Sequence, residues 1–428
     1  MKISASITLI AGSAFGLTAA SSIVSRNNDG ATLTPIRILQ GGYNSSYAVL
    51  EFNPFVEPNT LRVATRYNTS DGNLKAWLSR HPINSNIIIG CNDNSVPNAP
   101  GYLTSYSLNS KTGEMKYIDS VDTGGYPVPD YSVAAAHCAF FPSGKIAVVA
   151  NYFGQSASTF SFDPQTGKFG SQSNKGLLDF PGYTPIQGQI GVAGNDNTSQ
   201  ATSHPHMIAT HPFLPVFYLP DLGEDKIHVY KIGANDSLSN LTSYQQPLGS
   251  GPRHLTFTLS GQYMYVLHEL AVNIRPYQVD QATGELTQIQ DDQPIYPGNA
   301  TFSLNISAAE VHVSNDGRFL YASNRNLTAA TLIESGDASD TIAVWSIGTN
   351  GTITRIQSAM AYGARQIRAM ELSPAGMTAS AGGEDYIVAG GLKTDDTFVF
   401  KRNKLNGTLE LVAEVEETYM PSTYLWLG

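Results

Sequence analysis

One structural unit recurs along most of this chain, and the recurrence constrains the fold more than any other feature of the sequence. The unit has four short apolar segments, with a Pro, Asp or Gly turn between the first two and a Gly turn between the last two. A glycine between two alternating apolar and polar runs is typical of a tight β-hairpin, because the turn needs a positive φ. These hairpin glycines are Gly113, Gly167, Gly284, Gly351 and Gly407. A sixth copy of the turn, Asn235-Asp236-Ser237, lacks the glycine.

Six such units run from about residue 81 to residue 417, and strands are left over at both ends. Tyr47 to Asn53 and Leu61 to Arg66 precede the first unit, and Ser422 to Leu427 follows the last. A C-terminal strand that completes the N-terminal sheet would remove the exposed edges of an open array. We therefore predict an all-β chain that forms a single seven-bladed β-propeller of four-stranded blades. Two β-sandwich domains are the alternative, which fits the strand content but not the repeat.

The first residues predict a signal peptide. Lys2 is followed by an uncharged segment from Ile3 to Leu17 and by small residues up to Ala20, an arrangement typical of export and cleavage. A membrane anchor is the alternative, but it requires about 20 strongly apolar residues, and no later segment predicts a membrane span. We predict a signal peptide at residues 1–20, a flexible N-terminal segment at 21–33 and the propeller at 34–428.

Ten Asn-x-Ser/Thr sequons follow the predicted signal peptide. Together with that peptide they predict N-linked glycans and a secreted protein, either extracellular or in a cell wall. The sequons are Asn44, Asn68, Asn197, Asn235, Asn240, Asn299, Asn305, Asn326, Asn350 and Asn406.

The charge of the chain argues against nucleic acid as a partner. Its formal net charge is −10 and only 14% of its residues are charged, whereas phosphate binding favours a basic surface. Its two cysteines, Cys91 and Cys138, lie in apolar β-like segments. The sequence is therefore consistent with a disulfide between them and with two buried thiols. His204-Pro205-His206 has no third ligand at a diagnostic spacing, and we expect no metal.

Polar residues recur at the start of the innermost strand of several units. Counting back seven positions from the first turn glycine gives these starts directly in three units, and the fourth follows by correspondence. The starts are His137, His206, His254 and Glu310. The second strands run antiparallel to the first, so Glu269 and Arg325 at their ends return to the same mouth of the central channel. This convergence predicts a functional site, although polar groups at strand ends also bind backbone atoms and water.

Several motifs resemble those of the seven-bladed lactonase family, which includes propeller-type 6-phosphogluconolactonases and fungal 3-carboxy-cis,cis-muconate cyclases. The likeness covers nearly the whole chain after the signal peptide. Its motifs are Ser203-His204-Pro205-His206, Gly251-Pro252-Arg253-His254-Leu255, His268-Glu269-Leu270, the segment Ala309 to Ser314 and the segment Asp316 to Arg325.

The resemblance implies a catalytic set and no cofactor. The catalytic residues would be His206, Arg253, Glu269 and Arg325, with His204 as the alternative histidine. Substrate-binding residues would be His204, His254, Glu310 and His137. Two guanidinium groups can bind a small anionic substrate and stabilise charge on a lactone oxygen, while histidine and glutamate exchange the proton.

We therefore expect a secreted enzyme that opens or closes a lactone ring on a small polyanionic substrate. Phosphorylated sugar lactones are scarce outside cells, so 6-phosphogluconolactonase activity is the least expected activity of the family. A non-catalytic glycoprotein that uses the propeller as a binding surface is the alternative, and the sequon at Asn326, beside Arg325, favours it. A carbohydrate-active propeller would need paired carboxylates, for which Glu269 and Glu310 are candidates.

Overall fold

The computed structural model describes residues 25–26, 32–43, 46–69, 74–93, 99–126, 131–173, 177–183, 199–296, 306–326, 340–360, 364–377 and 385–427. The chain divides into two units, Met1–Thr34 and Pro35–Gly428. In the first unit, β1 (Ser25–Arg26) pairs with β2 (Thr32–Leu33). The predicted signal peptide lies outside the described residues. No helix within the described ranges is long and apolar enough to cross a membrane.

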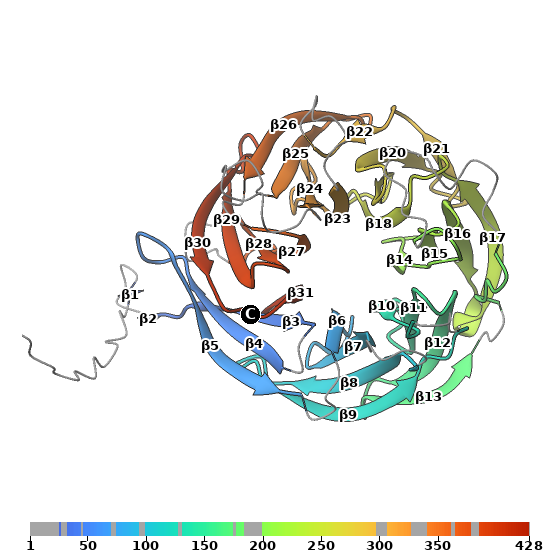
Figure 1. Ribbon diagram of the computed structural model, residues 1–428, viewed down its shortest axis with the longest axis horizontal. Coiled ribbons are helices and arrows are strands. Elements are labelled where there is room, and N and C mark those ends of the chain that lie inside the picture. The colour runs from blue at the N-terminus through green and yellow to red at the C-terminus, as the bar shows by residue number, and fades with distance from the viewer. Residues whose placement is uncertain are drawn as a thin grey trace, which may run out of the picture. The chain divides into compact units, whose positions relative to one another are not determined.

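Seven antiparallel sheets form the described part of the second unit and surround one axis, as Figure 1 shows. Blade 1 contains β31 (Pro421–Leu427), β3 (Ile36–Gly42), β4 (Ser46–Asn53) and β5 (Thr60–Asn68). Blade 2 contains β6 (Leu74–Arg80), β7 (Ile87–Asp93), β8 (Tyr102–Leu108) and β9 (Met115–Asp122). Blade 3 contains β10 (Ala135–Phe140), β11 (Ile146–Asn151), β12 (Ser156–Asp163) and β13 (Lys168–Ser173).

The remaining blades follow in chain order. Blade 4 contains β14 (Ala209–Thr210), β15 (Val216–Asp221), β16 (Lys226–Ile232), the 3₁₀ turn η1 (Ala234–Asp236) and β17 (Leu238–Gln245). Blade 5 contains β18 (Pro252–Phe257), β19 (Tyr263–His268), β20 (Asn273–Val279), β21 (Leu286–Gln288) and the short β22 (Gln293–Pro294). Blade 6 contains β23 (Ile306–Val313), β24 (Phe319–Asn326), β25 (Thr341–Ile347) and β26 (Ile353–Met360). Blade 7 contains β27 (Ile367–Leu372), β28 (Asp385–Gly391), β29 (Asp396–Arg402) and β30 (Leu409–Val415).

The C-terminal strand closes the ring. β31 pairs with β3 and becomes the innermost strand of the N-terminal blade. This confirms the predicted seven-bladed propeller and its mode of closure. The predicted start of the first complete unit, near residue 81, was too late, because β6 already belongs to blade 2. Its Lys75 is fully buried over the ring of Tyr106, and this lysine interrupts the apolar pattern of the strand.

The hairpin glycines have the predicted backbone conformation, with φ values of 74° to 81°. In blade 4, Asn235 and Asp236 adopt φ values of 57° and 58° without a glycine. The carbonyl groups of these turns also join neighbouring blades, because Tyr265 donates a hydrogen bond to Gly351 and Tyr321 donates one to Gly407, both at 3.0 Å. The repeated turn therefore sets both the hairpin and the spacing of the blades.

Hydrophobic clusters lie between neighbouring blades around the described ring. The cluster between blades 5 and 6, for example, contains Tyr265, Leu320 and Trp345. Cys91 and Cys138 lie together in another cluster as buried thiols that are not joined by a disulfide, which decides between the two alternatives for them. Burial of apolar surface between blades, at about 25 cal/mol per Å², is the main force that holds the ring together.

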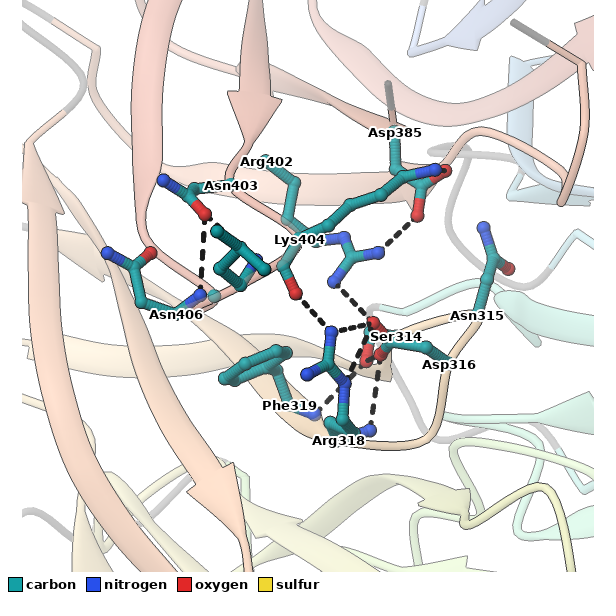
Figure 2. A network of polar contacts seen from close by, with 12 residues as sticks. Ser314, Asn315, Asp316, Arg318, Phe319, Asp385, Arg402, Asn403, Lys404 and Asn406 are labelled. Carbon is teal, nitrogen blue, oxygen red and sulfur yellow. Dashed lines mark hydrogen bonds and ion pairs between the residues drawn. The ribbon is translucent and has the colours of Figure 1, made fainter. Parts of the chain in front are cut away.

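A buried ion-pair network joins blades 6 and 7 and is drawn in Figure 2. Arg402, whose side chain is 1% exposed, binds Asp316 at 3.0 Å and also donates to Asp385. Asp316 belongs to the turn between β23 and β24, so this arginine fastens that turn to the neighbouring blade. Arg318, half-exposed at 51%, pairs with the same Asp316 at 3.0 Å.

We expect Arg402→Met to lower the free energy of unfolding by about 3–5 kcal/mol, because it leaves the buried Asp385 carboxylate without its closest cation. Arg318→Met is the matched control. It should lower the free energy of unfolding by less than about 1 kcal/mol, because the ion pair of Arg318 is exposed to water. Urea denaturation of both variants measures the difference. Equal losses would contradict the role given to the buried pair.

Candidate functional site

Three histidines from three blades lie together near the propeller axis. His137 lies on β10, His206 precedes β14 and His254 lies on β18. The ring centroids of His206 and His254 are 5.0 Å apart, and those of His137 and His254 are 5.7 Å apart. Trp77 of blade 2 packs against His137 at 4.6 Å and His254 at 5.5 Å. The structure thus brings together the strand starts that the sequence aligned.

Two arginines hold Glu269 from both sides. Nε of Arg253 lies 2.9 Å from one carboxylate oxygen of Glu269, and a terminal nitrogen of Arg325 lies 2.6 Å from the other. Both arginine side chains are buried, at 2% and 9% exposure, whereas Glu269 keeps 15%. Each carboxylate oxygen therefore has its own charge partner, which fixes the orientation of Glu269.

Glu310 connects the histidines to these arginines. Its carboxylate lies 3.0 Å from Nδ1 of His254, 3.5 Å from Arg253 and 3.6 Å from Nε2 of His312. Arg253 also donates to the backbone carbonyl of Ala309. Arg253 therefore contacts both Glu269 and Glu310, and its side chain links the two carboxylates.

An irregular register at the start of the inner strands places these side chains. In five blades, the pairing between the inner strand and its neighbour leaves residues of the inner strand unpaired. Blades 2, 3, 5 and 7 each leave out one residue, and blade 6 leaves out two. The unpaired residues are Ala76, Ala136, Arg253 and Arg368, and in blade 6 Ala309 and Glu310. A bulge of this kind turns the extra residue out of the strand pattern and is common beside functional sites. In two blades the extra residue is an arginine, and in two others it is an alanine that leaves space.

A cavity of about 210 Å³ lies beside this cluster. Its lining residues are Tyr43, Ala134, Ala136, Tyr152, Phe153, His206, Glu269 and Arg368. Of the predicted residues, His206 and Glu269 reach this wall, whereas Arg253 and Arg325 are not among its lining residues and contact Glu269 instead. His204 stacks on Tyr152 at 4.3 Å, and its Nε2 lies 2.8 Å from the hydroxyl of Thr202.

Arg368, which also lines the cavity, is not among the site residues predicted from the sequence. Its guanidinium carbon lies 5.1 Å from the ring centroid of Tyr43. A sequence signal for this residue exists, because Arg368 precedes Ala369 as Arg253 precedes His254, and Ala369 and His254 both lie seven positions before a turn glycine. At the ends of the second strands of blades 2 and 3, the side chains serve local structure, since Asn92 donates to Thr104 and Asn151 donates to Ser156.

The local charges favour neutral histidines and an ionised Glu269. Burial and the positive charge of Arg253 hold the pKa values of His206 and His254 well below the ordinary value. Burial alone would raise the pKa of Glu269, but Arg325 and Arg253 bring it below the usual range. Burial raises the pKa of Glu310 despite Arg253. The arginines therefore outweigh the ionised carboxylates, and the cavity favours an anion.

We expect the rings of His137, His206 and His254 to stay neutral at pH 5.5, where an ordinary histidine is about 90% protonated. The folded pKa values are lowered, so the unfolded chain takes up the protons first as the pH falls. The stability that these rings contribute is thus present above about pH 6.5 and lost below it. Histidine-selective NMR should show no titration shift for these three rings between pH 8 and 5.5 in the folded protein. The urea-unfolded chain is the control, and a folded-state midpoint near 6.5 would contradict the expectation.

The fold and this site together define a class of protein: a seven-bladed propeller with a cavity beside its axis that is lined by Arg368 and by the arginine-bound Glu269. The family model described as "Lactonase, 7-bladed beta-propeller" matches residues 40–426. The chain therefore belongs to the seven-bladed β-propeller lactonase family, as the sequence motifs predicted.

Individual relatives support the same assignment. A 6-phosphogluconolactonase from Formosa agariphila is 29% identical over 315 residues, which cover 72% of this chain and 76% of that protein. A probable 6-phosphogluconolactonase from Arthroderma benhamiae is 25% identical over 389 residues, which cover 86% of this chain and 87% of that protein. The solved structure of a periplasmic gluconolactonase from Pseudomonas aeruginosa matches with a TM-score of 0.73 at 21% identity, covering 92% of this chain and 99% of that one. This last likeness concerns the fold alone.

Proposed function

We propose that this protein hydrolyses a small anionic lactone in the cavity bounded by His206, Glu269 and Arg368. The observation that carries the proposal is this single cavity, in which a neutral histidine, a fixed carboxylate and an arginine share one wall. Relatives named as 6-phosphogluconolactonases support lactone hydrolysis as the reaction class.

His206 is suited to act as the general base. Its Nδ1 is buried and has no hydrogen-bond partner among the described residues. Burial and the positive charges of Arg253 and Arg368 lower its pKa, and a bound anion would oppose the effect of the charges and strengthen the base. His206 would accept a proton from water as the water oxygen attacks the lactone carbonyl carbon. It would return that proton to the ring oxygen when the carbon–oxygen bond breaks, which leaves a hydroxy acid.

Arg368 and Glu269 would position the substrate and stabilise charge. Arg368 lines the cavity and can bind the anionic group of the substrate or the oxyanion that forms on the carbonyl oxygen. The Glu269 carboxylate can accept a hydrogen bond from a substrate hydroxyl and stabilise the imidazolium form of His206. Arg253 and Arg325 then act through Glu269 as positioning residues.

Turnover of a lactone panel tests the function. The purified chain should hydrolyse anionic aldonolactones, such as 6-phosphogluconolactone, at least tenfold faster than neutral gluconolactone in kcat/KM. Arg368→Gln should remove that preference, because the substrate anion loses its charge partner. Hydrolysis no faster than the spontaneous rate across the panel would refute the proposal and favour a non-catalytic binding protein.

Carboxymuconates belong in the same panel, since the cationic cavity also suits a tricarboxylate. Ring closure of a muconate adds a carboxylate to a double bond and needs a proton donor but no water. The product therefore distinguishes the two reactions, because only hydrolysis adds water and gives a hydroxy acid. Lactone formation from 3-carboxymuconate would identify a cyclase and overturn the assignment as a hydrolase.

We also propose that the protein is secreted and glycosylated. Five described sequons have exposed asparagines, and all lie on outermost strands or on the turns that lead to them: Asn68, Asn235, Asn240, Asn350 and Asn406. Asn326 is different, with 7% exposure inside β24, so a glycan there has no room beside the site. Because Asn326 is buried, its sequon does not support the alternative of a non-catalytic glycoprotein.

Mass spectrometry of the protein from a eukaryotic secretory host should find glycans at the exposed sequons and none at Asn326. The measurement uses peptide mapping before and after enzymatic deglycosylation. A fully occupied Asn326 would contradict the burial argument, and unmodified peptides throughout would contradict secretion through a glycosylating pathway. Asn44, Asn197, Asn299 and Asn305 lie outside the described residues.

A further inference from the structure

A second cluster of ionisable side chains lies in blade 4, on the hairpin between β15 and β16. Asp221 ends β15, Glu224 lies in the turn and His228 is the third residue of β16. All three side chains are buried, and one ligand atom from each lies within 4.8 Å of the others. The cluster is separate from the proposed lactone site, since none of its members lines that cavity.

His228 carries a buried nitrogen that is not satisfied. Its residue exposure is 7%, and its Nε2 has no hydrogen-bond partner among the described residues. Nε2 lies 3.7 Å from a carboxylate oxygen of Glu224. The other ring nitrogen, Nδ1, lies 3.3 Å from the hydroxyl of Ser243, and Phe180 stacks on the ring at 4.5 Å. These contacts hold the imidazole so that Nε2 is directed at the carboxylates.

In blades 3 and 5, the polar side chains at the position that corresponds to His228 have partners within the protein. In the strand register, Ser158 in blade 3 and Arg275 in blade 5 correspond to His228. Ser158 accepts a hydrogen bond from Asn151 at 3.3 Å, and Arg275 pairs with Asp292 at 2.6 Å. The blade 7 equivalent is the apolar Phe398. The unsatisfied histidine is thus a feature of this hairpin and not a requirement of the blade.

Two carboxylates and one imidazole nitrogen form a suitable ligand set for a divalent transition metal. Zinc binds histidine nitrogen and carboxylate oxygen at about 2.0–2.2 Å and often has three protein ligands with water as the fourth. Lys226, whose side chain is 31% exposed, lies 2.8 Å from Glu224 and could turn outward when a metal binds.

We propose that Asp221, Glu224 and His228 form a binding site for one divalent transition-metal ion, with Zn²⁺ as the best-matched ion. The site stabilises the segment that carries His206. Asp221 accepts a hydrogen bond from the backbone of His204 at 2.7 Å, and Pro220 accepts one from His206 at 2.9 Å. A metal that fixes Asp221 therefore also restrains the strand that leads to the lactone cavity.

Metal analysis of the full chain tests the site. The protein is stripped with EDTA and dialysed against Zn²⁺ or Mn²⁺, and bound metal is measured by mass spectrometry and affinity by calorimetry. We expect one bound equivalent, a higher Tm with the metal, and at least a tenfold weaker affinity in both His228→Gln and Glu224→Gln. Circular dichroism checks that each variant is folded.

His206→Gln is the matched control. It removes a buried histidine from the lactone cavity and should leave one equivalent of metal bound to the protein. Loss of the equivalent in His206→Gln with retention in His228→Gln would place the ion in the lactone cavity and overturn the proposal. Failure of the wild-type chain to bind either metal would overturn it as well. Neither result depends on lactone turnover, so the site and the proposed function can fail independently.

Discussion

Glu269→Gln is expected to lower kcat/KM for the best anionic lactone by about 10²–10⁴-fold, the range typical of a lost group in acid–base catalysis. Glutamine keeps the shape of the side chain but removes the charge that Arg253 and Arg325 hold in place. The neutral amide can no longer stabilise the imidazolium form of His206. Steady-state kinetics on the wild type and the variant measure the loss.

Two controls separate chemistry from folding in this experiment. Glu285→Gln makes the same change on an exposed hairpin and should leave kcat/KM within about twofold, since surface substitutions are usually near neutral. The Tm of Glu269→Gln shows whether the buried arginines tolerate the loss of their partner. A folded variant with activity within threefold of wild type would exclude Glu269 from the reaction.

Deletion of residues 421–428 is expected to abolish cooperative folding. β31 supplies the innermost strand of blade 1, with Tyr424, Trp426 and Leu427 each 3–4% exposed. It also contacts both neighbouring blades, since Trp426 donates to the carbonyl of Glu371 and Ser422 donates to that of Lys75. Loss of one large buried side chain costs about 3–5 kcal/mol, so losing the whole strand exceeds the 5–15 kcal/mol that holds a typical protein folded.

Thermal unfolding followed by circular dichroism measures this effect. The truncated chain should show no cooperative transition and should aggregate through the free edge of β3. Trp426→Ala is the milder variant and should remain folded with a lower Tm, whereas Leu405→Ala, at an 86% exposed position, should change little. A truncated chain with a wild-type transition would show that the ring does not depend on this strand.

The two predictions share one structural cause. The innermost strands bear the bulges at Arg253 and Arg368, and the closed ring sets where the starts of these strands lie around the axis. Closure by β31 and orientation of the site are therefore coupled, because a blade free to tilt would move its strand start away from the axis. A variant with a weakened closure should lose activity before it loses secondary structure.

Much of this architecture could be predicted from the sequence because the repeat is local. The hairpin glycines and the alternating strands depend on backbone conformation within about 15 residues, and each copy reinforces the others. The grouping of His137, His206 and His254 followed from counting along equivalent strands, since equivalent positions in a propeller share one distance from the axis. The antiparallel return of the second strands led to Glu269 and Arg325, but not to the roles that their contacts give them.

Contacts between blades could be decided only by the tertiary structure. The one-residue bulge at Arg368 leaves no mark in the apolar pattern, and the sequence left open whether Cys91 and Cys138 form a disulfide or stay as buried thiols. The cluster of Asp221, Glu224 and His228 was hidden for a similar reason, because its residues read as an ordinary polar hairpin until their burial is seen. Sequence periodicity determines which face of a strand is buried, but the pairing of buried charges depends on distances between chain segments that no local pattern encodes.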